Sequence, residues 1–196
     1  MADAHDPQDV HPEYRARALE EALVERGWLA PGLIDGRLRR AAGEDPISAA
    51  ALVVARAWTD PDFRARLLTD ATAAAASLGF GGGHGERLVA LGQSESEHHV
   101  IVCTLCSCYP TALLGPPPAW YKSDDYRARV VREPRAVLAE FGTHLPADTK
   151  VTVWDSTAEV RYFTVPPRPA DGEGLSEVDL AALVTRDALI GVRTLV

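Results

Sequence analysis

Three cysteines, Cys103, Cys106 and Cys108, are the only thiols in the 196-residue chain, and they lie within six consecutive residues. Their spacings of three and two residues concentrate the thiol chemistry in one short segment, "VCTLCSCYP". Thiolates act as nucleophiles and as ligands for soft or borderline transition metal ions. Since unrelated core cysteines would not gather in this way, and an odd number cannot pair internally, the segment predicts a metal site.

The spacing also predicts how the segment would surround an ion. A tight turn can bring Cys103 and Cys106, three residues apart, to one side of the loop. The sulfur and nitrogen of Cys108, the nitrogen of Ser107 and the sulfur of Cys106 can close chelate rings, laying two sulfurs and two amide nitrogens in a plane. Cys103 then supplies an axial sulfur, and the opposite position stays open for water or substrate. Such an ion must be acidic enough to deprotonate amides. The metal ligands predicted in this way are Cys103, Cys106, Ser107 and Cys108.

A structural zinc site or an iron–sulfur cluster fits this pattern less well. Structural zinc usually takes four protein ligands, so His98 or His99 would have to supply the fourth. Those two histidines begin a predicted strand, and we expect a structural or strand-edge role for them. Iron–sulfur clusters usually take four cysteines, and this chain has three. The residues alone thus predict metal binding without naming the metal.

The composition narrows the class of protein. Hydrophobic residues make up 46% and charged residues 24%, and the net charge is −8, which is ordinary for a soluble globular protein. An acidic chain of this kind is not expected to bind nucleic acid. The start, "MADAHDPQDVHPEYR", has no apolar signal-peptide core, and no apolar run reaches the roughly 20 residues that span a bilayer. We therefore expect a cytoplasmic protein without a membrane partner, in which thiols stay reduced.

The chain changes character near residue 80, and we expect an α+β fold in two regions. Residues 1–80 predict a helical N-terminal arm, and residues 81–196 predict an α+β metal-binding domain. Proline, glycine and capping signals in the first region predict three helices, at residues 11–28, 47–58 and 59–79. In the last of these, Asp60 is the expected N-cap and Gly79 the expected end.

The second region alternates between strand and helix signals. β-Branched and aromatic runs predict four strands, at residues 87–91, 98–103, 150–155 and 160–166. The sequence "STAE" between the last two strands predicts a hairpin. Proline predicts an irregular loop over 110–121 and a break near Pro134 in the helix over 123–142. Ser176 and Asp179 predict the start of a final helix.

The cysteine segment and its flanks resemble the α subunit of nitrile hydratase. The residues that carry the resemblance are "VCTLCSCYP" with the following "LLGPPPAWYKSDDYRARVVREPRAVLAEFG", and the later "RYFTVPPRPADGEGLSEVDLAALVTRDALIGV". The likeness covers roughly residues 86–192 well and the N-terminal helices loosely. It implies a layered α/β catalytic domain with the metal site at a subunit interface, preceded by a helical arm that grips the partner.

In that family the segment from Cys103 to Cys108, called the claw below, holds a low-spin, non-corrin Co(III) ion or a non-haem Fe(III) ion. The resemblance implies that Cys103 is the axial thiolate, that Cys106 is oxidised to a sulfinate and that Cys108 is oxidised to a sulfenate. Thr104 and Tyr109 are similar to the cobalt class, whereas iron members tend to have Ser and Thr at these positions.

The resemblance also implies an enzyme, a nitrile hydratase, which adds water to a nitrile to give an amide. A trivalent ion is a strong Lewis acid that can polarise the nitrile or activate water. The Cys108 sulfenate, beside the open position, is the expected catalytic nucleophile or general base. The implied partners are a β-type subunit, in one chain or split into two, and a metallochaperone or activator for maturation. Arginines of the β-type subunit would hydrogen-bond the oxygenated sulfurs.

Thr111 departs from the family pattern. Members usually have tryptophan directly after "CYP", where it helps to wall the substrate pocket, and this chain has threonine there. Pro116 likewise stands where the family has leucine. A small side chain at Thr111 should leave a large volume beside the metal, which implies a bulky, heteroaromatic nitrile. The family member that hydrates the nucleoside antibiotic toyocamycin has such a substrate, and its partner is split into two smaller chains.

Two other functions remain open. The metal-bearing subunit of thiocyanate hydrolase shares the claw and the fold, although a widened pocket is a poor match for a small anion. A metal-binding or redox-sensing module without turnover would also use oxidisable cysteines. Such a module does not account for the long match on both sides of the claw.

Several polar and aromatic residues have simpler expected roles. Trp120 and Tyr121 are expected to pack the proline-rich loop, with a pocket or interface role as the alternative. Asp155 and Glu159 flank a turn and are expected to cap it. One predicted helix is expected to carry a salt-bridge face of arginines and acids. Its members are Arg127, Arg129, Arg132 and Arg135, with Asp124, Asp125 and Glu133.

Overall fold

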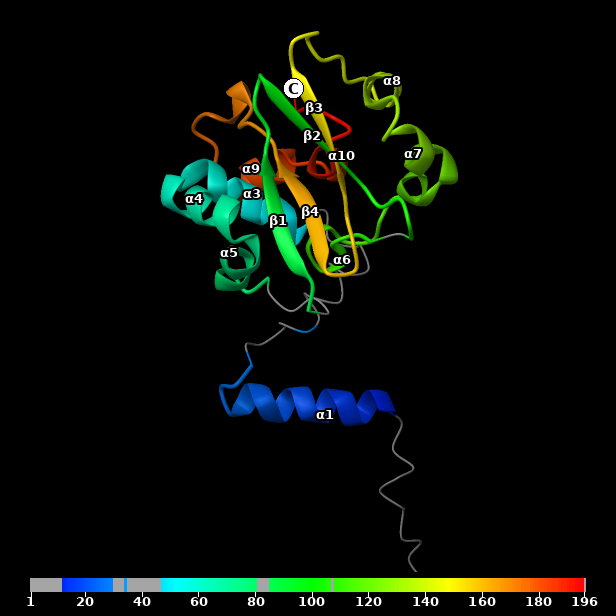
Figure 1. The fold of residues 1–196 in the computed structure, drawn as a ribbon. Coiled ribbons are helices and arrows are strands. Elements are labelled where there is room, and N and C mark those ends of the chain that lie inside the picture. The colour runs from blue at the N-terminus through cyan, green and yellow to red at the C-terminus, as the bar shows by residue number, and fades with distance from the viewer. Residues whose placement is uncertain (1–11, 30–33, 35–46, 81–84, 107, 196) are drawn as a thin grey trace, which may run out of the picture. The chain divides into compact units, whose positions relative to one another are not determined.

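The computed structural model describes residues 12–29, 34, 47–80, 85–106 and 108–195 of the chain (Figure 1). The chain divides into two compact units, Met1–Arg39 and Arg40–Val196. The first unit contains α1, Pro12–Glu25, where the sequence predicts a helix. The apolar side chains of Tyr14 and Leu19 on α1 are 68% and 61% exposed.

The second unit combines short helices with two pairs of strands, which confirms the α+β prediction. Its elements in chain order are α3 (Ala49–Thr59), α4 (Pro61–Thr69), α5 (Ala71–Ser77), β1 (Arg87–Gly92), β2 (Glu97–Val102), α6 (Thr111–Leu114), η2 (Ala119–Lys122), α7 (Asp124–Arg129), α8 (Pro134–Glu140), β3 (Lys150–Asp155), β4 (Val160–Val165), η3 (Ala170–Gly172), α9 (Glu177–Leu183) and α10 (Arg186–Ile190). Ser176 caps α9 by accepting from the Asp179 N–H at 3.2 Å, as predicted. The segment 110–121, expected to be irregular, contains the short turns α6 and η2. None of the helices in the described ranges is both long and apolar enough to cross a bilayer.

The region over 60–79 forms two helices, so the prediction of one continuous helix is wrong. Asp60 caps α4 as expected, accepting from the Phe63 N–H at 2.9 Å. Asp70 then leaves the helical conformation, with φ of −143°, and accepts from the Ala73 N–H at 3.0 Å to begin α5. A short acidic side chain that can bond the nearby backbone competes with continued helix, and the break falls at that residue.

The strands pair in parallel, β1 with β4 and β2 with β3. The predicted hairpin over 156–159 is wrong, because the two strands that it joins have different partners. The Ser156 N–H extends the β2–β3 pairing by donating to the Val102 carbonyl at 2.7 Å. Parallel pairing needs a long crossover connection, and the segment that carries α6, η2, α7 and α8 supplies the one between β2 and β3.

One buried cluster joins α3 to the strands and to the C-terminal helices. Val53 of α3, Val100 of β2 and Phe163 of β4 are fully buried. Trp58 ties α3 to the chain just after β4, its Nε1 donating to a backbone carbonyl at 2.8 Å. Residues 47–80, which the sequence analysis grouped with the N-terminal arm, therefore share a core with the α+β region.

The helices lie on two sides of the strands (Figure 1). α4 and α5 pack against β1, whereas α8 packs against β3 and contacts α7. β2 and β3 are in register with Val102 opposite Asp155, so the two strands end at the same edge. The claw begins at the next residue after Val102 and is therefore presented by the ends of two paired strands.

Candidate metal centre

The three cysteine sulfurs converge as their spacing predicts. Sγ of Cys106 lies 3.5 Å from Sγ of Cys103 and 3.1 Å from Sγ of Cys108, and all three lie within 4.8 Å of one another. Metal–thiolate bonds are about 2.3 Å long, so sulfurs at these separations can share one ion. A set of soft sulfur donors fits a transition metal. Ser107, the fourth predicted ligand, lies outside the described residues.

Burial makes ionisation of the Cys108 thiol costly. Cys103 and Cys108 are 1% and 9% exposed, whereas Cys106 is exposed. Burial, followed by hydrogen bonds with the Cys106 and Cys103 sulfurs, raises the pKa of the Cys108 thiol to about 12. The positive charge of Arg161 lowers that pKa, but it is the smallest of the causes. A bound cation favours the thiolate over the thiol, so a positive centre beside the sulfurs would oppose the raised pKa of the Cys108 thiol.

Asp155, at the end of β3, holds the second residue of the claw. Its carboxylate accepts from the Thr104 N–H at 2.9 Å and from the Thr104 hydroxyl at 2.5 Å. The Cys106 N–H donates to Cys103 Sγ at 3.4 Å, which closes the turn between the first two cysteines. Asp155 thus anchors the claw, a role that the sequence analysis missed when it assigned this residue to the following turn.

Two buried tyrosines hold the backbone just before the claw and at its last residue. Tyr126 of α7 donates to the Ile101 carbonyl at 2.7 Å, and Tyr121 of η2 donates to the Cys108 carbonyl at 2.9 Å. Burial raises the pKa of both phenols, so both stay protonated and able to donate. Trp120 packs edge-on against Tyr126, with ring centroids 4.9 Å apart. The packing role expected for Trp120 and Tyr121 is confirmed, and Tyr121 adds a hydrogen bond to the claw.

The arginines of α7 take two different roles. Arg129 forms ion pairs with three carboxylates, those of Asp125, Glu133 and Glu140, at 3.2, 2.6 and 2.5 Å. The predicted salt-bridge face is therefore confirmed at Arg129. Arg127 pairs with Asp124 at 2.5 Å, but its Nη1 also donates to the Cys106 carbonyl at 2.7 Å. Arg127 thereby contacts the claw, which the sequence analysis did not predict.

His98 and His99 serve the fold, as expected. His98 is 3% exposed, and its Nε2 lies 2.7 Å from the Gly191 carbonyl. Nδ1 of His99 accepts from Nε1 of Trp154 at 3.1 Å. Burial lowers the pKa of both imidazoles. The metal-capable cluster at the claw consists, over the described chain, of the three cysteines, so neither histidine supplies the fourth ligand of a structural zinc site.

Thr111 is the first residue of α6 and follows Cys108 by three residues. Its side chain is exposed, and its hydroxyl lies 3.5 Å from the Tyr109 carbonyl. The Tyr109 ring is buried edge-on against Tyr121, with centroids 5.0 Å apart. Within the described residues the buried Tyr109 hydroxyl has no hydrogen-bond partner. The pocket role of Thr111 remains a prediction.

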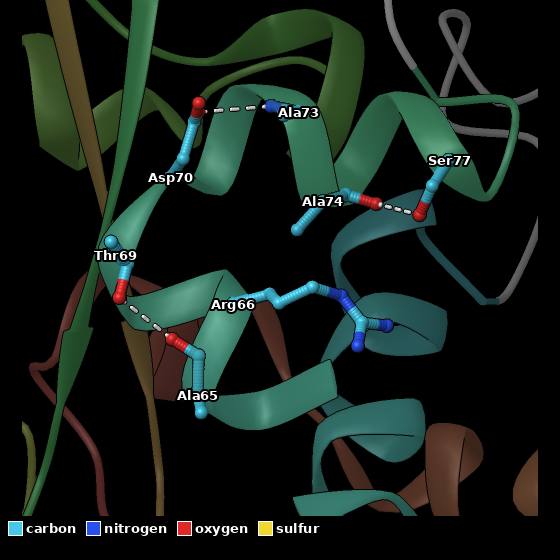
Figure 2. Close-up of a pocket in the computed structure, with 7 residues that line it drawn as sticks. All are labelled: Ala65, Arg66, Thr69, Asp70, Ala73, Ala74 and Ser77. Atoms are coloured by element: carbon cyan, nitrogen blue, oxygen red, sulfur yellow. Dashed lines mark hydrogen bonds between the residues drawn. The ribbon is translucent and has the colours of Figure 1, made fainter. Parts of the chain in front are cut away.

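Of two hollows in the second unit, one lies away from the cysteine cluster and one lies next to it. The first, of about 510 Å³, lies on α4 and α5 and contains no predicted site residue; Figure 2 shows its seven lining residues, including the Asp70 cap. The second, of about 350 Å³, includes Thr104 of the claw together with Arg127 and Arg132. The second hollow therefore adjoins the cysteine cluster.

Comparison with known sequences gives one consistent group of relatives. The family description "Nitrile hydratase, alpha chain" matches residues 10–193. The low-molecular-weight cobalt-containing nitrile hydratase subunit alpha of Rhodococcus rhodochrous is 50% identical over 178 residues, covering 91% of this chain and 86% of the relative. The thiocyanate hydrolase subunit gamma of Thiobacillus thioparus is 44% identical over 154 residues, covering 73% of this chain and 63% of the relative.

Solved structures of similar chains share the fold. A double mutant of the Fe-type nitrile hydratase from Comamonas testosteroni Ni1 superposes with a TM-score of 0.75 at 42% identity, covering 93% of this chain and 89% of that chain. A recombinant thiocyanate hydrolase with partially modified cobalt centres superposes with a TM-score of 0.73 at 37% identity, covering 92% of this chain and 88% of that chain. The similar structures thus include both iron and cobalt proteins.

Proposed function

Because the chain belongs to the nitrile hydratase alpha-chain family, we propose that its claw holds a low-spin, non-corrin Co(III) ion and hydrates a nitrile to the amide. The resemblance stated from the sequence is confirmed: the chain is a nitrile hydratase α subunit, and its enzyme class is hydro-lyase. The observation that carries the metal proposal is the convergence of the three cysteine sulfurs.

The proposed ligands are the sulfurs of Cys103, Cys106 and Cys108 and the backbone nitrogens of Ser107 and Cys108. When bound, the trivalent ion supplies the Lewis acidity that polarises a nitrile or lowers the pKa of water. Cys108, as the sulfenate, would attack the nitrile carbon as a nucleophile, or as a general base would take a proton from the water that attacks this carbon. Cys106, which is exposed, is the more accessible of the two to oxidants and is proposed to carry the sulfinate.

Cobalt is the proposed metal, with Fe(III) as the alternative. Thr104 and Tyr109 match the cobalt class, and a relative that is half identical is named as cobalt-containing. The Fe-type neighbour at 42% identity is the reason to keep iron as the alternative. Metal analysis of the purified enzyme decides between them.

The proposed substrate is a bulky, heteroaromatic nitrile. Thr111 is small and exposed where the family usually has tryptophan, and its position three residues after Cys108 is compatible with a wall of the substrate pocket. A toyocamycin-like nitrile is one substrate of this class. The proposal therefore rests on the small side chain of Thr111, three residues after Cys108, where the family usually has tryptophan.

Partner chains are proposed to cover the exposed side of the claw. Leu105 is 90% exposed and Cys106 is exposed as well. A β-type subunit, in one chain or two, would bury these side chains and bring arginines to the oxygenated sulfurs. A metallochaperone or activator would deliver the metal in the cytoplasm, where the thiols stay reduced before loading.

Thiocyanate hydrolysis is the second candidate function. It is favoured by the 44% identity to a thiocyanate hydrolase gamma subunit and by a TM-score of 0.73 to a solved thiocyanate hydrolase. We rank it second because the cobalt-named nitrile hydratase relative is more similar and covers more of both chains. A metal-binding or redox-sensing module without turnover is the third.

The experiment is co-expression of the chain with its β-type partner in cobalt-supplemented medium, followed by metal analysis, mass spectrometry and two assays. We expect bound cobalt, a sulfinic acid at Cys106, a sulfenic acid at Cys108 and unmodified Cys103. Nitriles should be converted to amides, and thiocyanate should not turn over. Thiocyanate turnover without amide formation would support the second candidate, and cobalt binding without either activity would support the third. Full amide formation by metal-free protein would overturn the proposal.

A further inference from the structure

We propose that Arg127 stabilises the metal-bound form of the claw by balancing negative charge on the Cys106 carbonyl oxygen. The inference rests on the proposed function, because it requires an ion held by the claw. It adds a positioning residue on α7 to the ligands that the claw itself supplies. Arg127 had been expected, with the other arginines of this helix, to serve a salt-bridge face.

Arg127 reaches from α7 to the claw backbone. Its Nη1 donates to the Cys106 carbonyl at 2.7 Å, and its Nη2 pairs with Asp124 at 2.5 Å. The side chain of Arg127 is 22% exposed, whereas that of Asp124 is 94% exposed. Water screens the exposed carboxylate, so Asp124 orients the guanidinium without cancelling its charge at the Cys106 carbonyl.

The Cys106 carbonyl belongs to the same peptide bond as the Ser107 nitrogen, which is a predicted metal ligand. A peptide nitrogen that binds a metal in this way has lost its proton, so the peptide unit becomes an anion. Resonance across the planar peptide bond shares the negative charge between the nitrogen and the carbonyl oxygen. The oxygen that Arg127 contacts therefore gains charge when the metal is bound. A hydrogen bond between two charged groups is stronger than one to a neutral carbonyl, so Arg127 favours the metal-bound form.

The third nitrogen of the Arg127 guanidinium, Nε, agrees with this role. Its Nε is buried and has no hydrogen-bond partner in the part of the chain that the structure describes. A buried polar group without a partner is unfavourable, and negative charge added to the neighbouring claw reduces that cost. The contacts of the guanidinium therefore suit a claw that carries negative charge better than a claw of three neutral thiols and uncharged peptide bonds.

Arg132 provides a matched control. It lines the same hollow of about 350 Å³ as Arg127, and its side chain is exposed. No side-chain hydrogen bond or ion pair joins Arg132 to another described residue. Replacing Arg132 thus removes the same charge from the same hollow without breaking a contact to the claw.

The test compares wild-type enzyme with Arg127→Lys, Arg127→Gln and Arg132→Gln, each assembled with its partner and loaded with cobalt. Lysine and glutamine are both shorter than arginine and both can donate to a carbonyl, but only lysine carries the charge. The rate of cobalt loss to an excess of chelator is followed by metal analysis and by the sulfur-to-cobalt charge-transfer absorption. The melting temperature of each enzyme prepared without cobalt reports any purely structural damage.

We expect Arg127→Gln to lose cobalt about 10- to 100-fold faster than wild type, if the loss of metal affinity that follows removal of groups supporting metal ligands appears in the dissociation rate. Arg127→Lys should recover part of this loss, Arg132→Gln should match wild type, and the absorption band should shift in Arg127→Gln alone. If Arg127→Gln retains cobalt as well as Arg132→Gln, the inference is wrong although the proposed function stands. Equal loss from Arg127→Lys and Arg127→Gln, with a lower melting temperature for both without cobalt, would also overturn it. If wild type itself binds no cobalt, both proposals fail.

Discussion

At the scale of the residue, the three cysteine sulfurs differ in burial, but each is a proposed ligand of the metal. Two are buried and one is exposed, yet each supplies a separate donor. Cys103→Ala, Cys106→Ala and Cys108→Ala should therefore each lose tightly bound cobalt, measured by metal analysis after gel filtration. Arg132→Gln serves as the control for general damage. A Cys108→Ala enzyme with full cobalt and full turnover would contradict the ligand assignment.

Thr111 is predicted to set the size of the substrate. Tryptophan is the largest side chain and threonine is small, so Thr111→Trp should close the volume that a ring system needs. We expect kcat/KM for a heteroaromatic nitrile to fall at least about 10-fold more than kcat/KM for acetonitrile, because one misfit group in a pocket already costs about 1–3 kcal/mol. Both substrates are assayed at equal cobalt content. An equal fall for both would assign Thr111 to support of the claw, and no change would remove the case for a bulky nitrile.

At the scale of the element, the break between α4 and α5 depends on one side chain. Asp70 caps α5 by accepting from the Ala73 N–H, so Asp70→Ala should lower the free energy of unfolding by about 1 kcal/mol. Glu173→Ala, a change at an exposed carboxylate, should stay within about 0.5 kcal/mol of wild type. Denaturant unfolding followed by circular dichroism measures both. An unchanged or higher free energy of unfolding for Asp70→Ala would mean that packing, and not the cap at Asp70, imposes the break.

β2 carries a titratable group whose burial makes stability depend on pH. Burial lowers the pKa of His98 in the folded chain, while the pKa of a histidine in the unfolded chain is about 6.5. The unfolded chain therefore binds the extra proton first, and the stability contributed by neutral His98 is lost as the pH falls below about 6.5. Between pH 7.5 and 5.5, wild type should lose about 1 kcal/mol more unfolding free energy than His98→Gln. His144→Gln, at an exposed histidine, should show the same fall in unfolding free energy between these pH values as wild type. A smaller fall in His144→Gln would mean that the pH dependence comes from the overall charge of the chain and not from His98.

At the scale of the whole molecule, the exposed side of the claw is predicted to bind the partner. Leu105 is 90% exposed beside the cysteines, and Val178 is a comparably apolar residue on α9 that is 60% exposed. Leu105→Asp should abolish co-purification of the β-type subunit, while the unfolding free energy of the chain changes by less than about 0.5 kcal/mol. Val178→Asp should leave co-purification intact. Normal assembly of Leu105→Asp would place the interface elsewhere.

Local signals in the sequence predicted the parts of the molecule that depend on neighbours in the chain. The spacing of the cysteines, the cap at Ser176 and the strand runs needed only residues a few positions apart. The prediction of a hairpin over 156–159 failed, because β3 and β4 pair with the earlier strands β2 and β1 and not with each other. Asp155 and Arg127 were missed at the claw for the same reason. Their contacts span 51 and 21 residues, and only the register of β2 with β3 and the packing of α7 bring them there.

The parallel pairing of β2 with β3 also sets an order in time for the synthesis of the protein. Asp155 follows Thr104 by 51 residues, and ribosomes add about 5–20 residues per second, so the cysteines are made roughly 3–10 s before the carboxylate that anchors their loop. During that interval the thiols belong to an unanchored segment of nascent chain. Metal loading therefore belongs after translation has passed β3, and chains arrested before Lys150 should take up no cobalt. A cell that makes this subunit must protect three neighbouring thiols from premature oxidation during those seconds. This requirement follows from the order of β2 and β3 along the chain.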